Sequence, residues 1–430
     1  MKIKTRILSY DEVMALPRPK HKKPLRPNRL LQLVIRILAV FDLVPVRFTY
    51  KKHGMEKIGK REPCLILMNH SSFIDLKIVS RIFFPKRYGI VCTSDGFVGK
   101  DLLMRLIGCI PTQKFVSDVT LIQDMEYLLK KKKTSVLMFP EASYSFDGRA
   151  TALPRKMGVL LKKLGVPVVT VITQGAFARD PLYNGLQKRK VLVRADVKCL
   201  VSAEELKQKS VAELDAMLDE AFGFDNFKWQ QENEVCIDEP FRADGLNRIL
   251  YKCPHCGAEG KTEGKGIRIT CKSCGKAYEL TELGWLRAVE DEGAFTHIPD
   301  WYDWQRQQVR KELTEGTYRL DVPVKIGVMV DRKAIYMVGG GRLEHDENSF
   351  RLTGCDGKLS YTQEPLACYS LYADYYWYEI GDVICIGNND VLFYCFPQEG
   401  DVVSKTRIAT EELYKIKKKQ RRAVKTADVQ

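Results

Sequence analysis

Two segments of the sequence place residues with acid–base chemistry directly after apolar runs. The first is NHSSFID, in which His70 is followed five positions later by Asp75. A neutral imidazole can take a proton from an attacking hydroxyl, and a carboxylate can hold the ring in the required tautomer. The spacing alone is not specific, because a histidine beside a helix start gives the same pattern. Ser71 or Ser72 can cap that helix, and Asp75 then has a structural role near its positive end.

The second segment is MFPEASYSFDGRATALPRKMG, residues 138–158. It offers Glu141, two serines and Arg149, and then Arg155 and Lys156 where a helix is expected to begin. Guanidinium groups, ammonium groups and the amides of a helix start are what proteins use to recognise phosphate. Both segments follow apolar runs that read as buried strands. We therefore expect them at the same edge of one sheet, where ligands of such sheets bind.

The elements that must position these residues are strands and helices in alternation between residues 63 and 225. Strands are expected at 64–68, 88–93, 135–140, 166–173 and 190–200, and helices at 76–84, 99–108, 121–133 and 154–165. Ser202 and Glu205 form a capping box for a further helix. This order predicts an α/β fold, with a mostly parallel sheet and helices on both of its faces.

Four blocks of the chain resemble the glycerolipid acyltransferase family, the 1-acylglycerol-3-phosphate acyltransferases and their relatives. NHSSFID is similar to the family's Asn-His-x4-Asp block, and FPEASYS to its Phe-Pro-Glu-Gly-Thr-Arg-Ser block. GCIPTQK, residues 108–114, stands where the family has a glycine and a basic residue, and VPVVTVI is similar to the later block around Pro167. The resemblance covers about residues 30–235.

The resemblance implies an enzyme that moves a fatty acyl group from a thioester, on coenzyme A or acyl carrier protein, to the hydroxyl of a lysophospholipid. His70 would be the general base and Asp75 its partner, with no metal in the chemistry. The residues implied to bind the acceptor are Asn69, Lys114, Glu141, Ser143 and Arg149.

Several positions depart from the family pattern. Tyr144 stands where the family has the arginine taken to bind the acceptor phosphate, Ala142 replaces its glycine, and Ser143 its threonine. Lys114 replaces an arginine, so it offers a point charge instead of a bidentate fork. Phosphate recognition is therefore expected to depend on Arg149, Lys114 or Arg155, unless the acceptor is not the usual one.

The cysteines predict a separate metal module. CPHC and CKSC supply Cys253, Cys256, Cys271 and Cys274, with fourteen residues between the two pairs. This spacing is typical of a zinc ribbon whose four thiolates leave no open coordination position, so the zinc is expected to be structural. A redox pair is the alternative. The start of the chain lacks the apolar core of a signal peptide, which favours a reducing compartment for the remaining cysteines.

The positive charge is concentrated near the start of the chain. Residues 1–61 hold sixteen Lys and Arg against four acidic residues, out of a total net charge of +15. The apolar segment 30–48 follows, but Arg36 and Asp42 make a full membrane span costly. We expect a helix lying in the membrane surface, with the protein peripheral on the cytoplasmic face; a helix packed on the domain is the alternative. The basic block 415–425 fits either an anionic surface or a solvated tail.

These features divide the chain into a basic segment with a surface helix (1–62), an acyltransferase domain (63–235), a zinc ribbon (245–290) and a β-rich region with a basic tail (295–430). A zinc ribbon with basic flanks also suggests a nucleic-acid-binding protein. Nucleic acid is not expected as a partner, because the ribbon itself is nearly balanced in charge. A third alternative is a non-catalytic lipid-binding protein on the same fold, which the altered FPEASYS block leaves open.

Overall fold

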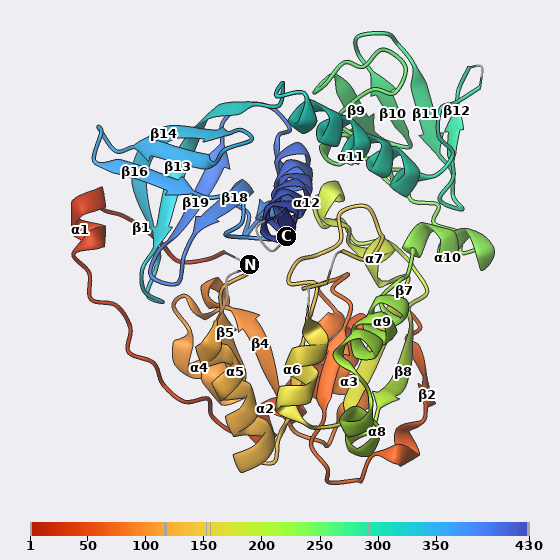
Figure 1. The fold of residues 1–430 in the computed structure, drawn as a ribbon. Helices are drawn as coiled ribbons and strands as arrows, with labels where there is room; N and C mark the ends of the chain where they lie inside the picture. Colours follow the sequence, from red (N-terminus) through yellow and green to blue (C-terminus); the bar gives the residue numbers. More distant parts are fainter. Residues whose placement is uncertain (1, 116–117, 152, 155, 291, 428–430) are drawn as a thin grey trace.

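The computed structural model of the protein describes residues 2–115, 118–151, 153–154, 156–290 and 292–427 (Figure 1). Two large sheets and a small third one organise these residues, and helices pack against and between them.

The first sheet carries the two polar segments, and its strand order is β2-β8-β7-β3-β6-β4-β5. The strands β3 to β7 are mutually parallel, whereas β8 runs antiparallel to β7 and pairs in parallel with β2. The mostly parallel sheet was predicted correctly, except that β2 and β5 were not foreseen. β5 is a short edge strand that contains Pro111, and β2 is exposed along its length, so neither has the apolar run of a buried strand. The strands are β2 (Thr49–His53), β3 (Leu65–Met68), β4 (Tyr88–Thr93), β5 (Cys109–Thr112), β6 (Ser135–Met138), β7 (Val168–Gln174) and β8 (Arg194–Val201).

Helices cover both faces of this sheet, as predicted. In β3 all four side chains are buried and alternate between the faces. Leu65 and Leu67 pack into a core with α5, α6 and α9, whereas Ile66 and Met68 pack into another with α2 and α3. The helices of this part are α2 (Arg29–Leu43), α3 (Asp75–Phe83), α4 (Asp101–Ile107), α5 (Val119–Glu126), α6 (Met157–Leu164), α7 (Ala176–Arg179), α8 (Ala203–Gln208) and α9 (Val211–Ala221).

The cysteine module is a small antiparallel sheet in the order β12-β11-β10-β9. Helix α10 (Asn226–Glu232) precedes it and α11 (Ile298–Thr314) follows it and packs against it. The indole of Trp301 donates a hydrogen bond to the carbonyl of Lys252, beside the first cysteine pair, and Gln305 bonds the backbone of Lys252 and Ile249. The strands are β9 (Thr262–Lys265), β10 (Arg268–Cys271), β11 (Ala277–Leu280) and β12 (Leu286–Ala288).

The third sheet contains most of the β-rich region and one strand from the start of the chain. Its order is β16-β15-β14-β13-β19-β18-β17, and β1 pairs in parallel with β14. β1 (Thr5–Ile7) leads through the short helix α1 (Tyr10–Met14) and an extended segment to α2. The other strands are β13 (Leu320–Met329), β14 (Ile335–His345), β15 (Phe350–Gly354), β16 (Leu359–Gln363), β17 (Tyr372–Trp377), β18 (Gly381–Gly387) and β19 (Leu392–Pro397).

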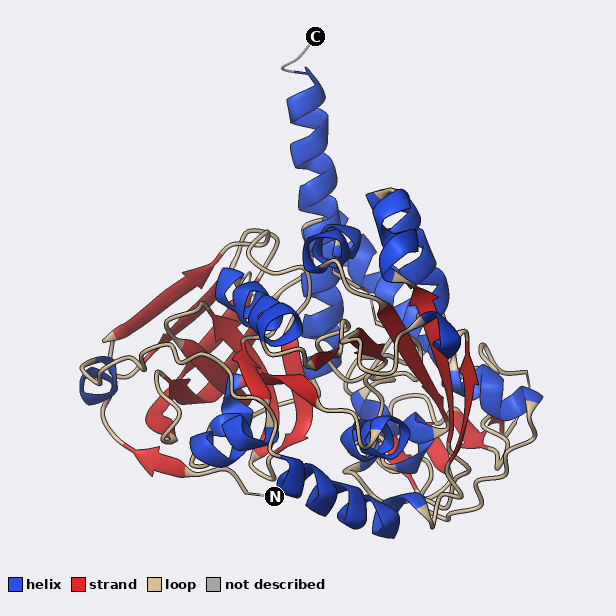
Figure 2. Ribbon diagram, turned by 90° about the horizontal axis from the view of Figure 1, so that it is seen from below, coloured by secondary structure: helices blue, strands red, loops and turns tan. Residues whose placement is uncertain are grey.

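The chain ends in a long helix, α12 (Val403–Ala427), instead of the basic tail expected from the sequence. Its first half is buried between the third sheet and α11, and its second half, which carries the basic block, projects beyond the rest of the molecule (Figure 2). Among the described residues, no helix is both long enough and apolar enough to span a membrane.

The carboxyl edge of the first sheet faces the third sheet and α12 (Figure 1). The hydroxyl of Tyr372 on β17 donates to Asp95, which follows β4, and Arg332 pairs with Asp101 at 3.0 Å. Val98 and Phe115 share an apolar cluster with residues of the third sheet. The edge at which a ligand would bind is therefore enclosed between parts of the chain that are far apart in sequence.

Candidate active site

His70 and Asp75 lie side by side at the end of β3. Asp75 Oδ2 is 2.9 Å from His70 Nδ1, and the same oxygen accepts hydrogen bonds from the backbone amides of Ser71 and Ser72 at 3.0 and 3.2 Å. An oxygen that already accepts two amide bonds acts as an acceptor toward Nδ1 as well. His70 therefore carries its proton on Nδ1 and has a lone pair on Nε2, the tautomer that a general base needs.

The loop between β3 and α3 holds this pair without a serine cap. The residue before α3, Ile74, has no side-chain cap, and Ser72 Oγ accepts from the Ile74 amide and donates to Asp180 at 2.5 Å. The expectation that Ser71 or Ser72 caps the helix is wrong. Asp75 takes both roles instead, since it accepts the loop amides and faces the imidazole.

Burial and charge tune the pair. Burial, and after it the nearby Lys114 ammonium, lowers the pKa of His70 well below its usual value. The ring is thus neutral around pH 7 and able to accept a proton. Burial pushes the pKa of Asp75 upward, against the amides of Ser72 and Ser71, which favour the carboxylate. A positive charge on the His70 ring favours the carboxylate as well. Asp75 Oδ1 is buried and has no hydrogen-bond partner within the described part of the chain.

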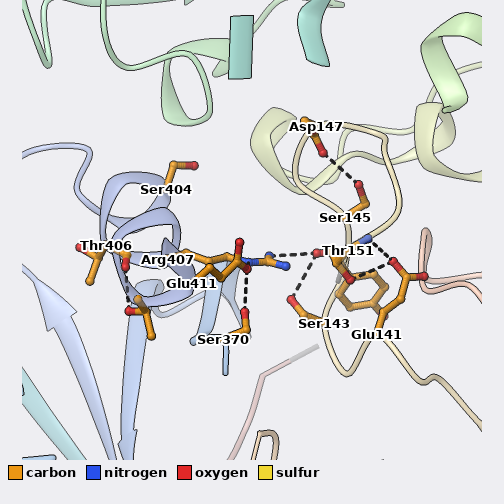
Figure 3. Close-up of polar contacts among 12 residues, drawn as sticks. Glu141, Ser143, Ser145, Asp147, Thr151, Ser370, Ser404, Thr406, Arg407 and Glu411 are labelled. Atoms are coloured by element: carbon orange, nitrogen blue, oxygen red, sulfur yellow. Dashed lines mark hydrogen bonds and ion pairs between the residues drawn. The ribbon is translucent and has the colours of Figure 1, made fainter. Parts of the chain in front are cut away.

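Glu141 joins the second segment to the first. Its Oε1 accepts the backbone amide of His70 at 3.1 Å, and its Oε2 accepts the amide and hydroxyl of Thr151 at 2.7 and 2.9 Å (Figure 3). The Ser145 amide in turn donates to the carbonyl of His70 at 3.2 Å. Burial raises the pKa of Glu141 to about 7, although these donors oppose the rise. Glu141 therefore holds together the first loop (residues 69–75) and the second loop (residues 141–151), with both of its oxygens occupied.

Two aromatic rings cover the faces of the His70 ring. The ring centroid of Tyr144 is 3.7 Å and that of Phe139 is 4.1 Å from the imidazole, both nearly parallel to it. Phe73 stacks on Tyr144 at 5.2 Å and is 53% exposed. The two rings restrict the orientation of the imidazole, whose Nδ1 faces Asp75 and whose side chain is 18% exposed. Sequence reasoning noted Tyr144 only as a departure from the family pattern and did not anticipate the stack.

Ala142, which stands where the pattern of the resembled family has glycine, has a left-handed backbone. Its φ is +55°, in the left-handed region that glycine enters freely. A residue with a Cβ adopts it at a cost of about 1 kcal/mol. The backbone of the second loop is thus strained close to His70.

Asn69 and Ser143 support the loops. Asn69 is fully buried and its amide bonds Ser71 and the backbone and side chain of Thr173, which ties β3 to β7. All its hydrogen-bonding capacity is used. Ser143 is also buried and donates to the carbonyl of Tyr144 at 3.2 Å. Both residues thus have structural roles in the loops, and their predicted substrate contacts stay predictions.

Arg149 is likewise unsuited to the role expected of it. Its guanidinium bonds Asp225 at 2.8 Å, Asp300 at 2.6 Å and Asp303 at 2.5 Å. Three carboxylates around one cation leave a local excess of negative charge, which repels a phosphate. The prediction that Arg149 holds the acceptor phosphate is corrected for this reason, since the residue fastens the second loop to α11.

Lys114 is the predicted cation that lies near the catalytic pair. Its ammonium is 4.0 Å from the ring centroid of Tyr372 and close enough to His70 to lower the pKa of the imidazole. It also favours the ionised form of Asp374, whose pKa burial raises to about 6. Arg155, the remaining candidate, lies outside the described residues.

A buried residue of α12 completes the surroundings of the second loop. Arg407 donates to the carbonyl of Tyr144 at 3.2 Å and to Glu411 at 3.3 Å (Figure 3). No motif marks Arg407, because it lies in an ordinary helical pattern more than 260 positions from its partner, and only the fold brings the two together.

The four predicted cysteines converge, away from the catalytic pair. Cys253 Sγ lies 3.8 Å from Cys274 Sγ, and all four sulfur atoms are within 4.8 Å of one another. The sulfurs of Cys256 and Cys271 are likewise 3.8 Å apart. Thiolates about 2.3 Å from a tetrahedral zinc are separated by about 3.8 Å, so the residues fit the ion. A zinc held by these four would leave no open position and would stabilise the ribbon.

The segment that contains the site matches known proteins. Residues 49–174 match the family model described as Acyltransferase. Over 127 residues the chain is 29% identical to a chloroplastic 1-acyl-sn-glycerol-3-phosphate acyltransferase of Brassica napus, a match that covers 28% of this chain and 36% of that protein. The resemblance to glycerolipid acyltransferases is confirmed for this segment, which is an acyltransferase domain.

Comparison with solved structures found a similarity to the 1-acyl-sn-glycerophosphate acyltransferase PlsC of Thermotoga maritima. It is 18% identical, with a TM-score of 0.33, and the similarity covers 43% of this chain and 76% of that one. The match to the Brassica napus protein spans about a third of that protein's length. The zinc ribbon, third sheet and α12 lie outside the residues that match the family.

Proposed function

We propose that the protein transfers a fatty acyl group from an acyl thioester, on coenzyme A or acyl carrier protein, to the hydroxyl of a lysophospholipid such as 1-acylglycerol-3-phosphate. The observation that carries this proposal is the His70–Asp75 pair, with Asp75 buried and the His70 side chain 18% exposed, at the carboxyl edge of an acyltransferase domain. Lysophosphatidic acid is the substrate class suggested by the name of the Brassica napus relative.

The geometry supports a general-base reaction. The acceptor hydroxyl gives its proton to Nε2 of His70 while its oxygen forms a bond to the thioester carbonyl carbon. The carbon–sulfur bond then breaks, and the imidazolium returns the proton to the leaving thiolate. Asp75 stabilises the imidazolium, and Tyr144 and Phe139 hold the ring in place. No side chain of the protein has to become acylated.

The acceptor phosphate is assigned to Lys114. Of the two cations predicted for it that the structure describes, Arg149 is surrounded by carboxylates, whereas Lys114 lies beside the imidazole. A lysine contributes a point charge, so its contact with phosphate tolerates variation in headgroup orientation more than an arginine fork does.

We also propose that the protein docks on the cytoplasmic face of a membrane through α2. Ala39 and Leu43 face the domain and are buried, while the opposite side of α2 is apolar and exposed. Basic residues precede the helix, as suits an anionic lipid surface. The exposed apolar residues on or next to α2 are Leu30, Leu33, Val34, Ile37, Leu38, Val40, Phe41 and Val44.

Acyl transfer is tested with the purified full-length protein, lysophosphatidic acid and acyl donors on either carrier. His70→Ala is expected to lose activity by a factor of about 10³, the usual contribution of a general base together with its partner. Undiminished transfer in this variant would reject the assigned base, whereas absence of transfer by the wild-type protein would favour the non-catalytic lipid-binding alternative.

Membrane docking is tested by flotation with vesicles that contain anionic phospholipid. Ile37→Glu with Phe41→Glu is expected to abolish flotation, because both side chains are exposed on α2. Val289→Glu is the matched control, since Val289 is an exposed apolar residue near the zinc ribbon. Flotation of the double variant at the level of the control would remove the docking proposal and leave the catalytic proposal standing.

A further inference from the structure

Helix α12 reaches the catalytic loop from outside the acyltransferase domain. Arg407 lies in its buried half and is only 3% exposed. Its guanidinium donates to the carbonyl of Tyr144 and to Glu411 (Figure 3). It also lies 4.4 Å from the ring centroid of Phe146. Two of these contacts are to the second loop, which places the end of the chain against the residues beside His70.

The guanidinium is itself held rigidly. Glu411 accepts from Arg407, from Ser370 at 2.7 Å and from Arg306 of α11 at 2.7 Å. Burial opposes the ionisation of Glu411, but the two guanidinium groups and Ser370 outweigh it and lower the pKa to about 2. The fork of Arg407 is therefore fixed by charges that are present at every physiological pH.

What Arg407 holds is the backbone of the residue that stacks on the base. The Tyr144 carbonyl accepts from Arg407 and from Ser143, and the Tyr144 ring lies 3.7 Å from the imidazole. The loop is strained two residues earlier, at Ala142, so it does not hold this conformation by its own preference. A fixed donor on α12 supplies the missing restraint.

We infer that Arg407 is a positioning residue for the proposed catalytic base: it fixes the Tyr144 backbone, and through the Tyr144 ring it fixes His70. The inference rests on the proposed function. It makes the C-terminal region a part of the catalytic unit and not an appended binding module.

The test compares the full-length protein with Arg407→Gln and with the control Arg310→Gln. Arg310 lies on α11 and pairs with Glu412, and no contact joins it to the second loop within the described residues. Arg407→Gln is expected to lower kcat about tenfold, because His70 is displaced. KM is expected to change little, because the binding of substrate is not altered. Arg310→Gln is expected to keep both constants.

A second measurement does not depend on activity. The pKa of His70 is followed by NMR in each variant, with His70→Ala used to assign the signal. Loosening of Tyr144 exposes the imidazole and is expected to raise its pKa in Arg407→Gln, while Arg310→Gln keeps the original value. The groups that face His70 are Asp75 on α3, Lys114 after β5, and Glu141 and Tyr144 on the second loop.

Arg407→Gln with the kcat and His70 pKa of the control would overturn the inference. If that variant does not fold, Arg407→Lys decides, since it keeps the charge beside Glu411 but loses the fixed fork. A rise in the His70 pKa supports the positioning role, and an unchanged pKa overturns it. Should the wild-type protein transfer no acyl group, the proposed function fails, and the NMR titration still decides whether Arg407 positions the ring.

Discussion

The two loops that form the candidate site are held by different means. The loop from Asn69 to Asp75 keeps the family's residues, and its side chains bond within the acyltransferase domain, at the end of β7 and at Asp180. The loop from Glu141 to Thr151 departs from the family at Ala142 and Tyr144, and Arg407 and α11 hold it from outside the domain.

This difference indicates how the chain tolerates its departures. A glycine at position 142 would relieve the left-handed backbone, and an arginine at 144 would bring its own charge. Here the strained alanine and the stacked tyrosine are combined with a helix that the family match does not include. Part of the support of this loop therefore comes from α11 and α12, which lie outside the residues that match the family.

The largest effect is expected from the first loop, in Asp75→Asn. An amide oxygen can accept the same hydrogen bonds but supplies no charge to stabilise the imidazolium, so kcat is expected to fall about a thousandfold. Steady-state kinetics at neutral pH measure this loss.

Asp101→Asn is the matched control, because Asp101 is also the first residue of a helix but pairs with the partly exposed Arg332. Its activity is expected to stay within about twofold of wild type. Equal losses of activity in the two variants would mean that Asp75 only supports the start of α3. The first loop would then have no demonstrated catalytic carboxylate.

Glu141→Gln breaks the link between the loops and is expected to have the next largest effect. In the wild type both Glu141 oxygens accept hydrogen bonds. The glutamine NH2 group would instead face an N–H or O–H donor, and the lost hydrogen bonds are expected to lower the free energy of unfolding by about 1–3 kcal/mol. Activity is expected to fall about tenfold through the misplaced base. Thermal unfolding measures the loss of stability, and steady-state kinetics measure the loss of activity.

Glu126→Gln serves as the control, since Glu126 makes a partly exposed pair with Lys130 on the sheet's helical layer. A Glu141→Gln protein as stable as this control would show that the loops do not depend on each other.

In the first loop the sequence predicted the pairing of His70 with Asp75 but not the roles of its serines and of Asn69, and it predicted the second loop only in part. The apolar runs fixed the strands, and the carboxyl ends of neighbouring parallel strands had to bring His70 and Glu141 together. The role of Arg149 was missed because Asp225, Asp300 and Asp303 surround it only in three dimensions. Long-range pairs of this kind leave no periodicity or spacing in the chain, which is also why Arg407 and the stacked Tyr144 went unrecognised.

Removal of zinc tests whether the support of the second loop extends to the ribbon. Cys271→Ser is expected to lose the metal and to loosen the contacts of Trp301 and Gln305, which seat α11. Because Arg306 of α11 holds Glu411, activity is expected to fall, but by less than in Glu141→Gln. Metal content and kinetics measure this.

Cys236→Ser is the control, because Cys236 is exposed and lies outside the cluster. A Cys271→Ser protein that retains one zinc per chain would contradict ligation by four thiolates. Full activity after loss of the metal would mean that the second loop does not depend on the zinc ribbon and is supported from outside the domain by α12.

The smallest effect is expected from Tyr144→Phe. This substitution tests whether the second loop contributes only a stacked ring to His70 or also the Tyr144 hydroxyl. Among the described residues the Tyr144 hydroxyl has no hydrogen-bond partner that holds it, whereas the ring stacks on His70 at 3.7 Å. Phenylalanine keeps the stack, so the rate is expected to stay within about twofold. The pH–rate profile is expected to keep its acid limb, which lies below the usual pKa of histidine because burial and Lys114 lower the pKa of His70, and a base is lost only when pH falls through its own pKa. A large loss of rate in this variant would mean that the hydroxyl takes part in binding or chemistry, and the second loop would then contribute a reacting group and not only a positioned ring.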